Sequence, residues 1–472
     1  MRPAQLLPEE DGTWNLIMTE AFSQLCDFAE EQMDEIGVPG VALGVLHEGE
    51  MATAAFGVTN VDHPLEVTAK TLFQIGSITK TFTAMAVLRL VDMGLLELGA
   101  TIRTYLPDFK VVDEAAATGA TIRHLLTHTA NWVGDFFIDT GAGDEALARY
   151  TAAMAQLEQL APLDTVWSYN VASFCLAGYV IEVLTGKSYR SALQDLVLEP
   201  LGLESVYFDA GGVITHRFAV GHGVGKKGSA VLRPWGLPRA FDPTGGIITD
   251  LKTLLRYAHF HLGDGKTEDG ARLLQPQLMA LMHAPQVTIW GKRAMGLSWF
   301  IDDIEGVRRL SHDGATIGQL SLLTLVPDRD FAVAVFANAA QGGSLTHPVT
   351  HRALELYLDV ATSQPRPIDA SHEQLAAYAG RYVRPYSDVE LYLEDGQLMI
   401  QVTPKQGFPN REAPPAPALP PMRVGLCGED QLLVLDGPAK GLTGEFIRTA
   451  DGTIGWFRIG GLRIGRLHKR TE

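Results

Sequence analysis

The chain has 472 residues, and its 38 Lys and Arg against 55 Asp and Glu give a formal net charge of −17. A surface this acidic repels phosphate backbones and anionic lipid, which excludes nucleic acid and membrane surfaces as expected partners. Hydrophobic residues make up 46% of the sequence and charged residues 20%, as in a folded protein with room for one large and one smaller domain. The three cysteines are far apart and predict neither a disulfide framework nor a zinc site.

The N-terminal sequence carries no secretion signal. Met1–Asp11 has no basic region followed by an apolar stretch, and no segment reaches the roughly 18 apolar residues of a membrane helix. We therefore expect a cytoplasmic protein. Such an enzyme does not normally meet cell-wall peptides or incoming antibiotics.

The first part of the chain alternates between helix and strand patterns. An amphipathic helix is predicted over Glu20–Gly37, followed by two strands, Val38–Leu46 and Met51–Gly57, on either side of a hairpin turn. A longer helix is predicted from Ser77 to a glycine stop at Gly94.

Helix patterns then give way to strands. Helical segments recur over residues 121–201, strand patterns return over 296–338, and a last helix is predicted over His351–Leu358. Strands near both ends with helices between them predict an α+β fold. One antiparallel sheet, flanked by helices, is assembled from both ends of the domain beside a helical subdomain.

The predicted secondary structure changes after residue 361. Residues 362–372 read as a Pro-containing linker, and short alternating strands over 373–472 predict a small all-β barrel. We therefore assign one domain to 1–361 and a second to 373–472. The proline-rich segment Pro409–Pro421 is predicted to be a stiff loop between two strands rather than a ligand for a partner domain.

The sharpest chemical signal is a serine and a lysine three residues apart at the start of the long helix. Ser77 and Lys80 would lie on one face of its first turn. A serine hydroxyl becomes a good nucleophile when a neighbouring base takes its proton, and the helix N-terminus favours developing negative charge. Ser-x-x-Lys also occurs by chance as a solvated cap. Its context, with Gly76 before it and an apolar helix after it, favours the catalytic interpretation.

Three motifs and one structural segment, in order along the chain, carry a family resemblance. Ile75–Thr83 resembles the nucleophile segment of the serine β-lactamase and penicillin-binding-protein superfamily, in the branch of class C β-lactamases, D-stereospecific peptidases and carboxylesterases. Thr121–Thr129 resembles the structural segment that follows it. Trp167–Asn170 resembles the tyrosine motif, and Ser311–Ala315 the third motif with His in place of Lys. The resemblance spans roughly residues 20–360, and the barrel resembles the lipocalin-like C-terminal domains of some members.

This resemblance implies roles for three catalytic residues. Ser77 would be the acylated nucleophile, and Lys80 and Tyr169 would share the general-base role. Tyr169 would then protonate the leaving group and help to activate the deacylating water or alcohol.

The resemblance also implies substrate-binding and oxyanion groups. The backbone N–H groups of Ser77 and Ala315 would form the oxyanion hole, with Gly314 beside it. His312 would form a hydrogen bond with the substrate or with Tyr169, and Asn170 would also face the substrate.

The tyrosine motif departs from the family pattern. Val171 stands where the pattern has asparagine, and Ser173 replaces a glycine. In another register Ser168–Asn170 matches a Ser-x-Asn motif of sister branches, but the downstream Phe174 favours Tyr169. The missing amide makes β-lactam and peptide turnover less expected than ester turnover.

Histidines do not predict a metal site here. His259 and His261 lie two apart on a helix, so they point to different faces, and we expect both to be exposed. The resemblance makes His124 and His128 structural. We expect no metal and no cofactor.

The predicted function is a serine hydrolase that forms a covalent acyl-enzyme with a small ester, amide or short peptide. A carboxylesterase or a D-amino-acid-type peptidase is favoured over an antibiotic-resistance enzyme. Two alternatives stay open: an acyltransferase or peptide cyclase with the same Ser-Lys-Tyr site, and a non-catalytic ligand-binding protein. The sequence leaves the oligomeric state open, a homo-oligomer included.

Overall fold

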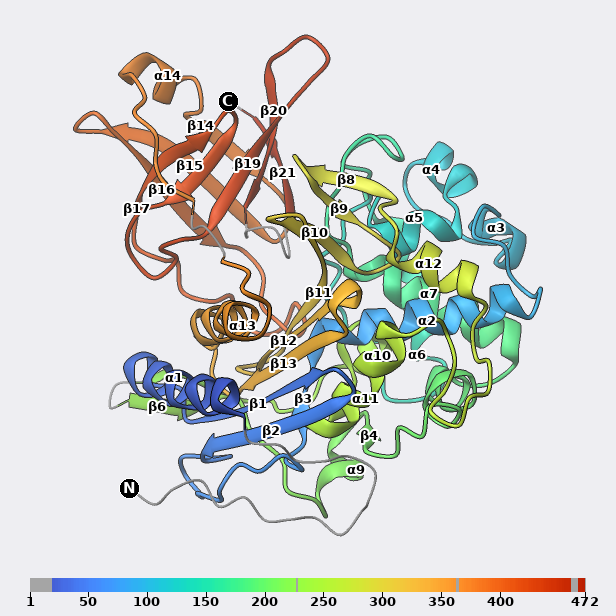
Figure 1. Cartoon of the computed structure of the whole chain (residues 1–472). Coiled ribbons are helices and arrows are strands. Elements are labelled where there is room, and N and C mark those ends of the chain that lie inside the picture. The colour runs from blue at the N-terminus through green and yellow to red at the C-terminus, as the bar shows by residue number, and fades with distance from the viewer. Residues whose placement is uncertain (1–18, 226–227, 362–364, 460–465, 472) are drawn as a thin grey trace. The chain divides into compact units, whose positions relative to one another are not determined.

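The computed structural model describes residues 19–225, 228–361, 365–459 and 466–471. The N-terminal stretch 1–11 and the first linker residues, 362–364, lie outside the described residues. The chain forms two compact units, drawn in Figure 1. The first contains Met1–Leu98, Ala142–Asp144 and Ala177–Thr362. The second contains Gly99–Gly141, Glu145–Leu176 and Ser363–Glu472.

The first unit is built on an eight-stranded antiparallel sheet whose strands come from both ends of the unit (Figure 1). Their spatial order is β2 (Glu50–Gly57), β1 (Gly40–His47), β13 (Phe331–Ala337), β12 (Leu320–Val326), β11 (Val307–Ala315), β10 (Phe300–Ile304), β9 (Arg293–Met295) and β8 (Val287–Trp290). Leu43 of β1 pairs with Val335 of β13, so strands nearly 300 residues apart in the chain are neighbours. The predicted sheet is confirmed.

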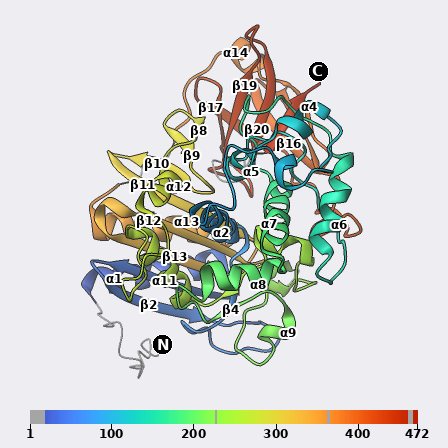
Figure 2. The ribbon, with the colours of Figure 1, turned by 90° about the vertical axis from the view of Figure 1, so that its right-hand side faces the viewer.

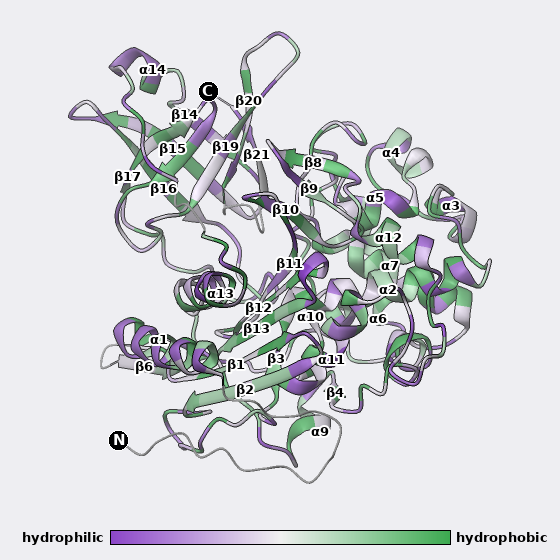
Figure 3. Cartoon of the chain, viewed as in Figure 1, coloured by the Kyte–Doolittle hydropathy of each residue, from purple (hydrophilic) through white to green (hydrophobic). Residues whose placement is uncertain are grey.

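Helices cover both faces of this sheet. Leu43 and Val335 belong to a core that also holds Phe22 of α1 (Glu20–Ile36) and Val349 of α13 (Gly343–Leu358). The next residue along β1, Gly44, faces the opposite way toward α11 (Leu251–Leu262), which packs on the other face (Figure 2). Figure 3 shows β1 and β13 as apolar, and α1 and α13 as mixed. Strand alternation therefore gives the sheet two buried faces.

One helix boundary differs clearly from the prediction. The last helix begins at Gly343 rather than His351, and it contains Pro348. Leu345 and Val349, four residues apart, are both fully buried against the sheet. The helix continues past Pro348 because the packing of this apolar stripe outweighs the loss of one backbone hydrogen bond.

Shorter elements complete the first unit. Its small strands are β3 (Phe73–Gln74), β4 (Val206–Tyr207), β5 (His222–Gly225), β6 (Gly228–Val231) and β7 (Ile248–Thr249). Its other helices are α2 (Thr79–Asp92), α8 (Tyr189–Leu193), α9 (Ala210–Val213), α10 (Asp242–Gly245) and α12 (Pro276–His283).

The second unit combines short helices with a closed barrel. The helices are α3 (Ile102–Tyr105), α4 (Glu114–Gly119), α5 (Ile122–Thr127), α6 (Ala146–Ala153), the start of α7 (Val171–Thr185) and α14 (His372–Ala376). The barrel strands are β14 (Gly380–Val383), β15 (Ser387–Glu394), β16 (Gln397–Pro404), β17 (Met422–Gly428), β18 (Gln431–Val434), β19 (Thr443–Arg448), β20 (Ile454–Ile459) and β21 (Arg466–Arg470). Since β21 pairs with β14, the predicted C-terminal barrel is confirmed.

Among the described helices, none taken singly combines the length and the hydropathy of a membrane span. One pair bent by 78°, Val171–Thr185 with Tyr189–Leu198, meets the same length and composition criteria when taken together.

Candidate active site

Ser77 lies in a tight turn ahead of the central helix. The turn, Gly76–Ile78, is a single turn of 3₁₀ helix, and α2 begins two residues after the serine. The predicted helix start at Ser77 is thus shifted to Thr79. The Nζ atom of Lys80, which is fully buried, donates a hydrogen bond to Ser77 Oγ at 3.0 Å.

A second turn holds the lysine from the other side. Lys80 Nζ also donates to the carbonyl oxygen of Thr244 at 2.7 Å, and the carbonyl of Pro243 accepts from Thr83 Oγ1 at 2.6 Å. Both carbonyls belong to α10. The turn is Pro243-Thr244-Gly245-Gly246, and the role of its backbone carbonyls has no side-chain signature in the sequence.

Asp242 at the start of α10 anchors that turn. Its carboxylate pairs with the guanidinium of Arg190 at 2.6 Å. Burial raises the pKa of Asp242 to about 6, although the hydrogen bond from Arg190 opposes this. The contact is structural, because it joins α10 to the guanidinium of Arg190.

Strand β11 lies against the turn Gly76–Ile78, and the two backbones approach each other closely. A Cβ on Gly314 would lie 1.8 Å from the carbonyl oxygen of Ile75, and a Cβ on Gly76 would lie 2.6 Å from the backbone nitrogen of Ala315. The hydroxyl of Ser321 on β12 donates to the same Ile75 carbonyl at 2.8 Å. The structure therefore brings the predicted oxyanion segment, Gly314–Ala315, next to Gly76.

His312 of β11 is fully buried. We assign its Nδ1–H as the donor to the carbonyl of Asp313, 2.7 Å away, which leaves Nε2 unprotonated. Burial, and then the charge of Lys80, lower the pKa of His312 to about 4. A neutral imidazole near Lys80 can accept a hydrogen bond, as the predicted role requires.

Tyr169 belongs to the second unit, where a histidine supports it. The ring of His128 stacks on that of Tyr169 at a centroid distance of 4.4 Å. The backbone N–H of Ser168 donates to the His128 carbonyl at 3.2 Å, and that of Asn170 to His128 Nδ1 at 3.0 Å. His128 is fully buried. Its structural assignment is now specific: it holds the residues on both sides of the tyrosine.

Asn170 begins α7. Its Nδ2 donates to the Trp132 carbonyl at 2.9 Å, and its Oδ1 accepts from the backbone N–H of Ser173 at 2.9 Å. This amide therefore fixes the start of the helix, a use that the sequence analysis did not foresee. Its contact with substrate stays a prediction.

The site residues are thus divided between the units. The first unit brings together Ser77, Lys80, His312, Gly314 and Ala315, and the second holds Tyr169 and Asn170. That Tyr169 meets Ser77 during the reaction stays a prediction.

Two barrel arginines reach the tyrosine segment, here residues 167–170, or the chain next to it, and no sequence motif pointed to either. Arg458 of β20 donates from Nη1 to the Trp167 carbonyl at 2.8 Å. Arg384, between β14 and β15, forms an ion pair with Asp135. A small cavity is lined by Ser168 and Tyr169 together with Arg384. In the sequence, neither arginine can be told from a solvated surface cation.

The prediction that both helix histidines are exposed was wrong: His261 is buried, and His259 is half-buried. His261 is 1% exposed, and its Nδ1 lies 3.0 Å from Nε2 of His283, which is also buried. It lies four residues after the buried Tyr257, on the inward stripe of α11. The two histidines do point to different faces, because His259 lines a surface hollow.

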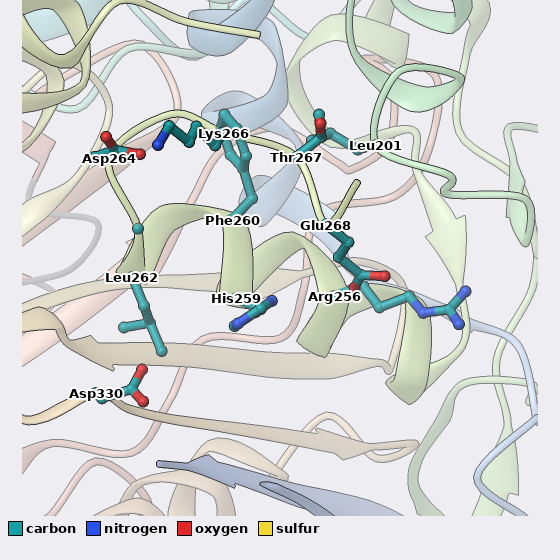
Figure 4. A pocket seen from close by; sticks show the side chains of 11 residues that line it. Leu201, Arg256, His259, Phe260, Leu262, Asp264, Lys266, Thr267, Glu268 and Asp330 are labelled. Atoms are coloured by element: carbon teal, nitrogen blue, oxygen red, sulfur yellow. The ribbon is translucent and has the colours of Figure 1, made fainter. Parts of the chain in front are cut away.

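That hollow is a separate feature (Figure 4). Charged side chains line it at the end of α11 and in the following turn, among them Arg256, Asp264, Lys266 and Glu268. It contains none of the predicted site residues, so it is not the candidate active site.

Comparison with known proteins identifies relatives over most of the chain. The family model described as Beta-lactamase matches residues 26–357. Penicillin-binding protein 4 of Amycolatopsis lactamdurans is 36% identical over 365 residues, which cover 74% of this chain and 93% of the relative. An unguisins hydrolase of Aspergillus campestris is 25% identical and covers 71% of this chain and 66% of its own length.

Solved structures share the architecture. The crystal structure of SurE superposes with a TM-score of 0.73 at 26% identity and covers 96% of this chain and 99% of its own; SurE has also been solved with D-Leu. A class C β-lactamase from Rhodobacter sphaeroides gives a TM-score of 0.60 at 21% identity over 71% of this chain and 99% of its own. The second likeness concerns the fold alone.

Proposed function

The chain belongs to the beta-lactamase family of serine hydrolases, and from that premise we propose that it acylates Ser77 with small ester or amide substrates. One observation carries the proposal: the buried amine of Lys80 lies 3.0 Å from Ser77 Oγ, within reach of its proton. A buried amine that is held against a serine hydroxyl can activate it as a nucleophile.

Acylation follows from this geometry. With Lys80 in its neutral form, Nζ takes the Ser77 proton as Oγ attacks the substrate carbonyl carbon. The carbonyl oxygen becomes an oxyanion that the N–H groups of Ser77 and Ala315 stabilise. The tetrahedral intermediate collapses, the bond to the leaving group breaks, and Tyr169 gives that group a proton. Water attacks the acyl-enzyme by the reverse sequence and regenerates Ser77.

The substrates proposed are small esters or short peptides with a D-residue at the acylating position. SurE, which was solved with D-Leu, supports the D-residue, and the fungal relative, named as an unguisins hydrolase, supports hydrolysis. Val171, which begins α7 with its backbone N–H bonded to the Gly134 carbonyl, supplies no side-chain amide for a peptide substrate. Esters should therefore react faster than the matching amides.

The test compares wild type, Ser77→Ala and Ser23→Ala with p-nitrophenyl esters of N-acetyl-D-leucine and N-acetyl-L-leucine. Ser23 is an exposed serine of α1 and serves as the matched control. We expect turnover, and an intact mass increased by the acyl group, in wild type and in the Ser23 variant. Neither should appear in the Ser77 variant.

Turnover that survives in Ser77→Ala would overturn the proposal. Faster reaction of the L-ester would contradict the substrate class alone. If an added amine, rather than water, accepts the acyl group, the protein is an acyltransferase with the same nucleophile.

A further inference from the structure

Arg458 is one of the most deeply buried charges in the barrel. Its side chain is 2% exposed and pairs with Glu445, which is 3% exposed, through Nε and Oε2 at 2.9 Å. Glu445 and Arg458 are cross-strand partners on β19 and β20. This pair removes the cost of burying a lone charge, and it also fixes where the guanidinium points.

The rest of that guanidinium is directed at the tyrosine segment. Nη1 donates to the Trp167 carbonyl at 2.8 Å, and Cζ lies 5.3 Å from the centre of the Trp167 ring. Trp167 precedes Tyr169 by two residues. Arg458 of the barrel thus contacts both the backbone and the ring of Trp167.

Arg384 holds the segment behind the tyrosine. It pairs with Asp135, and its Nε donates to Ser387 Oγ at 2.9 Å within the barrel. The carbonyl of Gly134, next to Asp135, accepts the backbone N–H groups of Val171 and of the residue after it, both at 3.2 Å. The chain is therefore held on both sides of Tyr169.

We propose that Arg458 is a positioning residue that holds the Trp167 carbonyl and thereby fixes Tyr169, so that the barrel is part of the catalytic apparatus. This inference rests on the proposed function, in which Tyr169 moves protons. A proton donor must stay within tenths of an ångström of its working position. Because Arg458 contacts no reacting atom in this scheme, its loss should lower kcat and leave KM nearly unchanged.

The control is a second arginine–carboxylate pair of the barrel, which is more exposed than the pair of Arg458 and Glu445. Arg448 and Asp430 form two hydrogen bonds of 2.7 Å, and Arg448 Nη1 also donates to the Gly452 carbonyl, in the barrel, at 2.9 Å. A general effect of removing an arginine–carboxylate pair from the barrel should appear in both variants, and the unfolding temperature reports the difference in stability that follows from the deeper burial of Arg458.

The experiment measures kcat, KM, acyl-adduct formation and the unfolding temperature. The test variant is Arg458→Met with Glu445→Gln, so that no buried carboxylate is left unpaired; the control is Arg448→Met with Asp430→Asn. We expect the test variant to lose about 10²-fold in kcat, with KM within about 3-fold by the reasoning above. Ser77 should still form the adduct, more slowly. The control should keep wild-type kcat.

Two further variants isolate positioning from stability. Arg458→Lys keeps the charge beside Glu445 but not the planar fork, and it should restore part of kcat. In a Tyr169→Phe background, the Arg458 and Glu445 substitutions should cause no further loss, since both changes remove the same function.

The outcomes separate the two proposals. If wild type forms no adduct at Ser77, the proposed function fails. If the adduct forms and Tyr169→Phe is impaired, but the test variant keeps the kcat of the control, the positioning role alone is overturned. Fully additive losses in the Tyr169→Phe background would also overturn it.

Discussion

Gly314 packs so closely against the turn that holds Ser77 that this position has no room for a side chain. Its Cα hydrogen faces the Ile75 carbonyl, and a Cβ there would approach that oxygen to 1.8 Å. Gly76 is equally constrained, because its φ of +50° places it in the left-handed region and it faces the backbone of Ala315. The motifs around Ser77 and His312 therefore supply glycines that allow close backbone approach, as well as reactive side chains.

Gly314→Ala should therefore remove most of the activity. The new methyl must push β11 away from the turn, which moves the Ala315 N–H from the oxyanion position and costs about 10²-fold or more in kcat. Gly343→Ala at the start of α13 is the control, because a Cβ there meets nothing within 4 Å. The measurement is ester turnover, with the unfolding midpoint beside it. Equal kcat in both variants would contradict the close approach.

His312 leads to a second prediction at the residue scale. Burial, with Lys80 adding to it, lowers the pKa of His312 to about 4, so its ring is neutral from about pH 5 upward. His312→Gln should lower kcat/KM but leave unchanged the midpoint of any titration of activity between pH 5.5 and 8. A pH–rate profile checks this. A titration in that range that disappears in the variant would show that His312 is charged there.

At the scale of helices and strands, tertiary packing set boundaries and buried positions that the periodicity of the sequence did not predict. The pattern located α1, the β1–β2 hairpin, the main strands and the barrel. It missed the 3₁₀ turn at Gly76–Ile78 and the first turns of α13, because local propensity does not record which residues a sheet buries. The inward position of His261 has the same origin. Its partner, His283, lies on α12, which only the fold brings near.

The His261–His283 pair should make the protein sensitive to acid. Burial lowers the pKa of His283 to about 3 and that of His261 well below its usual value. The unfolded chain binds more protons than the folded one below about pH 6.5, so this stability is present above that pH and is lost as the pH falls.

Each such histidine contributes a slope of about 1.4 kcal/mol per pH unit in the range between the two pKa values. His283→Gln should therefore flatten the fall in unfolding free energy between pH 5.5 and 4 by about that slope. Denaturant titrations at several pH values measure it, with His259→Gln on the outward face of α11 as the control. An unchanged slope in His283→Gln would show that this residue does not take up a proton on unfolding.

At the scale of the whole molecule, contacts between distant parts of the chain build each unit. Phe22, Val335 and Val349 share one core in the first unit. In the second, Arg384 of the barrel pairs with Asp135, 249 residues earlier. The two groups are 14% and 6% exposed, so breaking the pair leaves a charge away from water.

Asp135→Asn should destabilise the protein by about 3–5 kcal/mol, the cost of leaving a buried arginine without its carboxylate. Equilibrium unfolding in denaturant gives this difference. Asp436→Asn removes the carboxylate from the exposed Arg423 pair and should leave the midpoint unchanged. If the two variants unfold alike, the Arg384 pair does not hold the barrel to the segment at Asp135.

The sequence by itself determined the reaction class and the α+β sheet with its C-terminal barrel, and it predicted the segment that would hold the nucleophile. They follow from patterns visible in the sequence: the spacing of Ser77 and Lys80, the alternation of residues along the strands, and the order of the motifs. Only the tertiary structure decided that the Thr244 carbonyl holds Lys80, that His128 supports Tyr169, and that Arg458 reaches Trp167. These contacts join residues 41 to 291 positions apart. Hydrogen bonds to backbone carbonyls leave no trace in residue type, so no local pattern can report them.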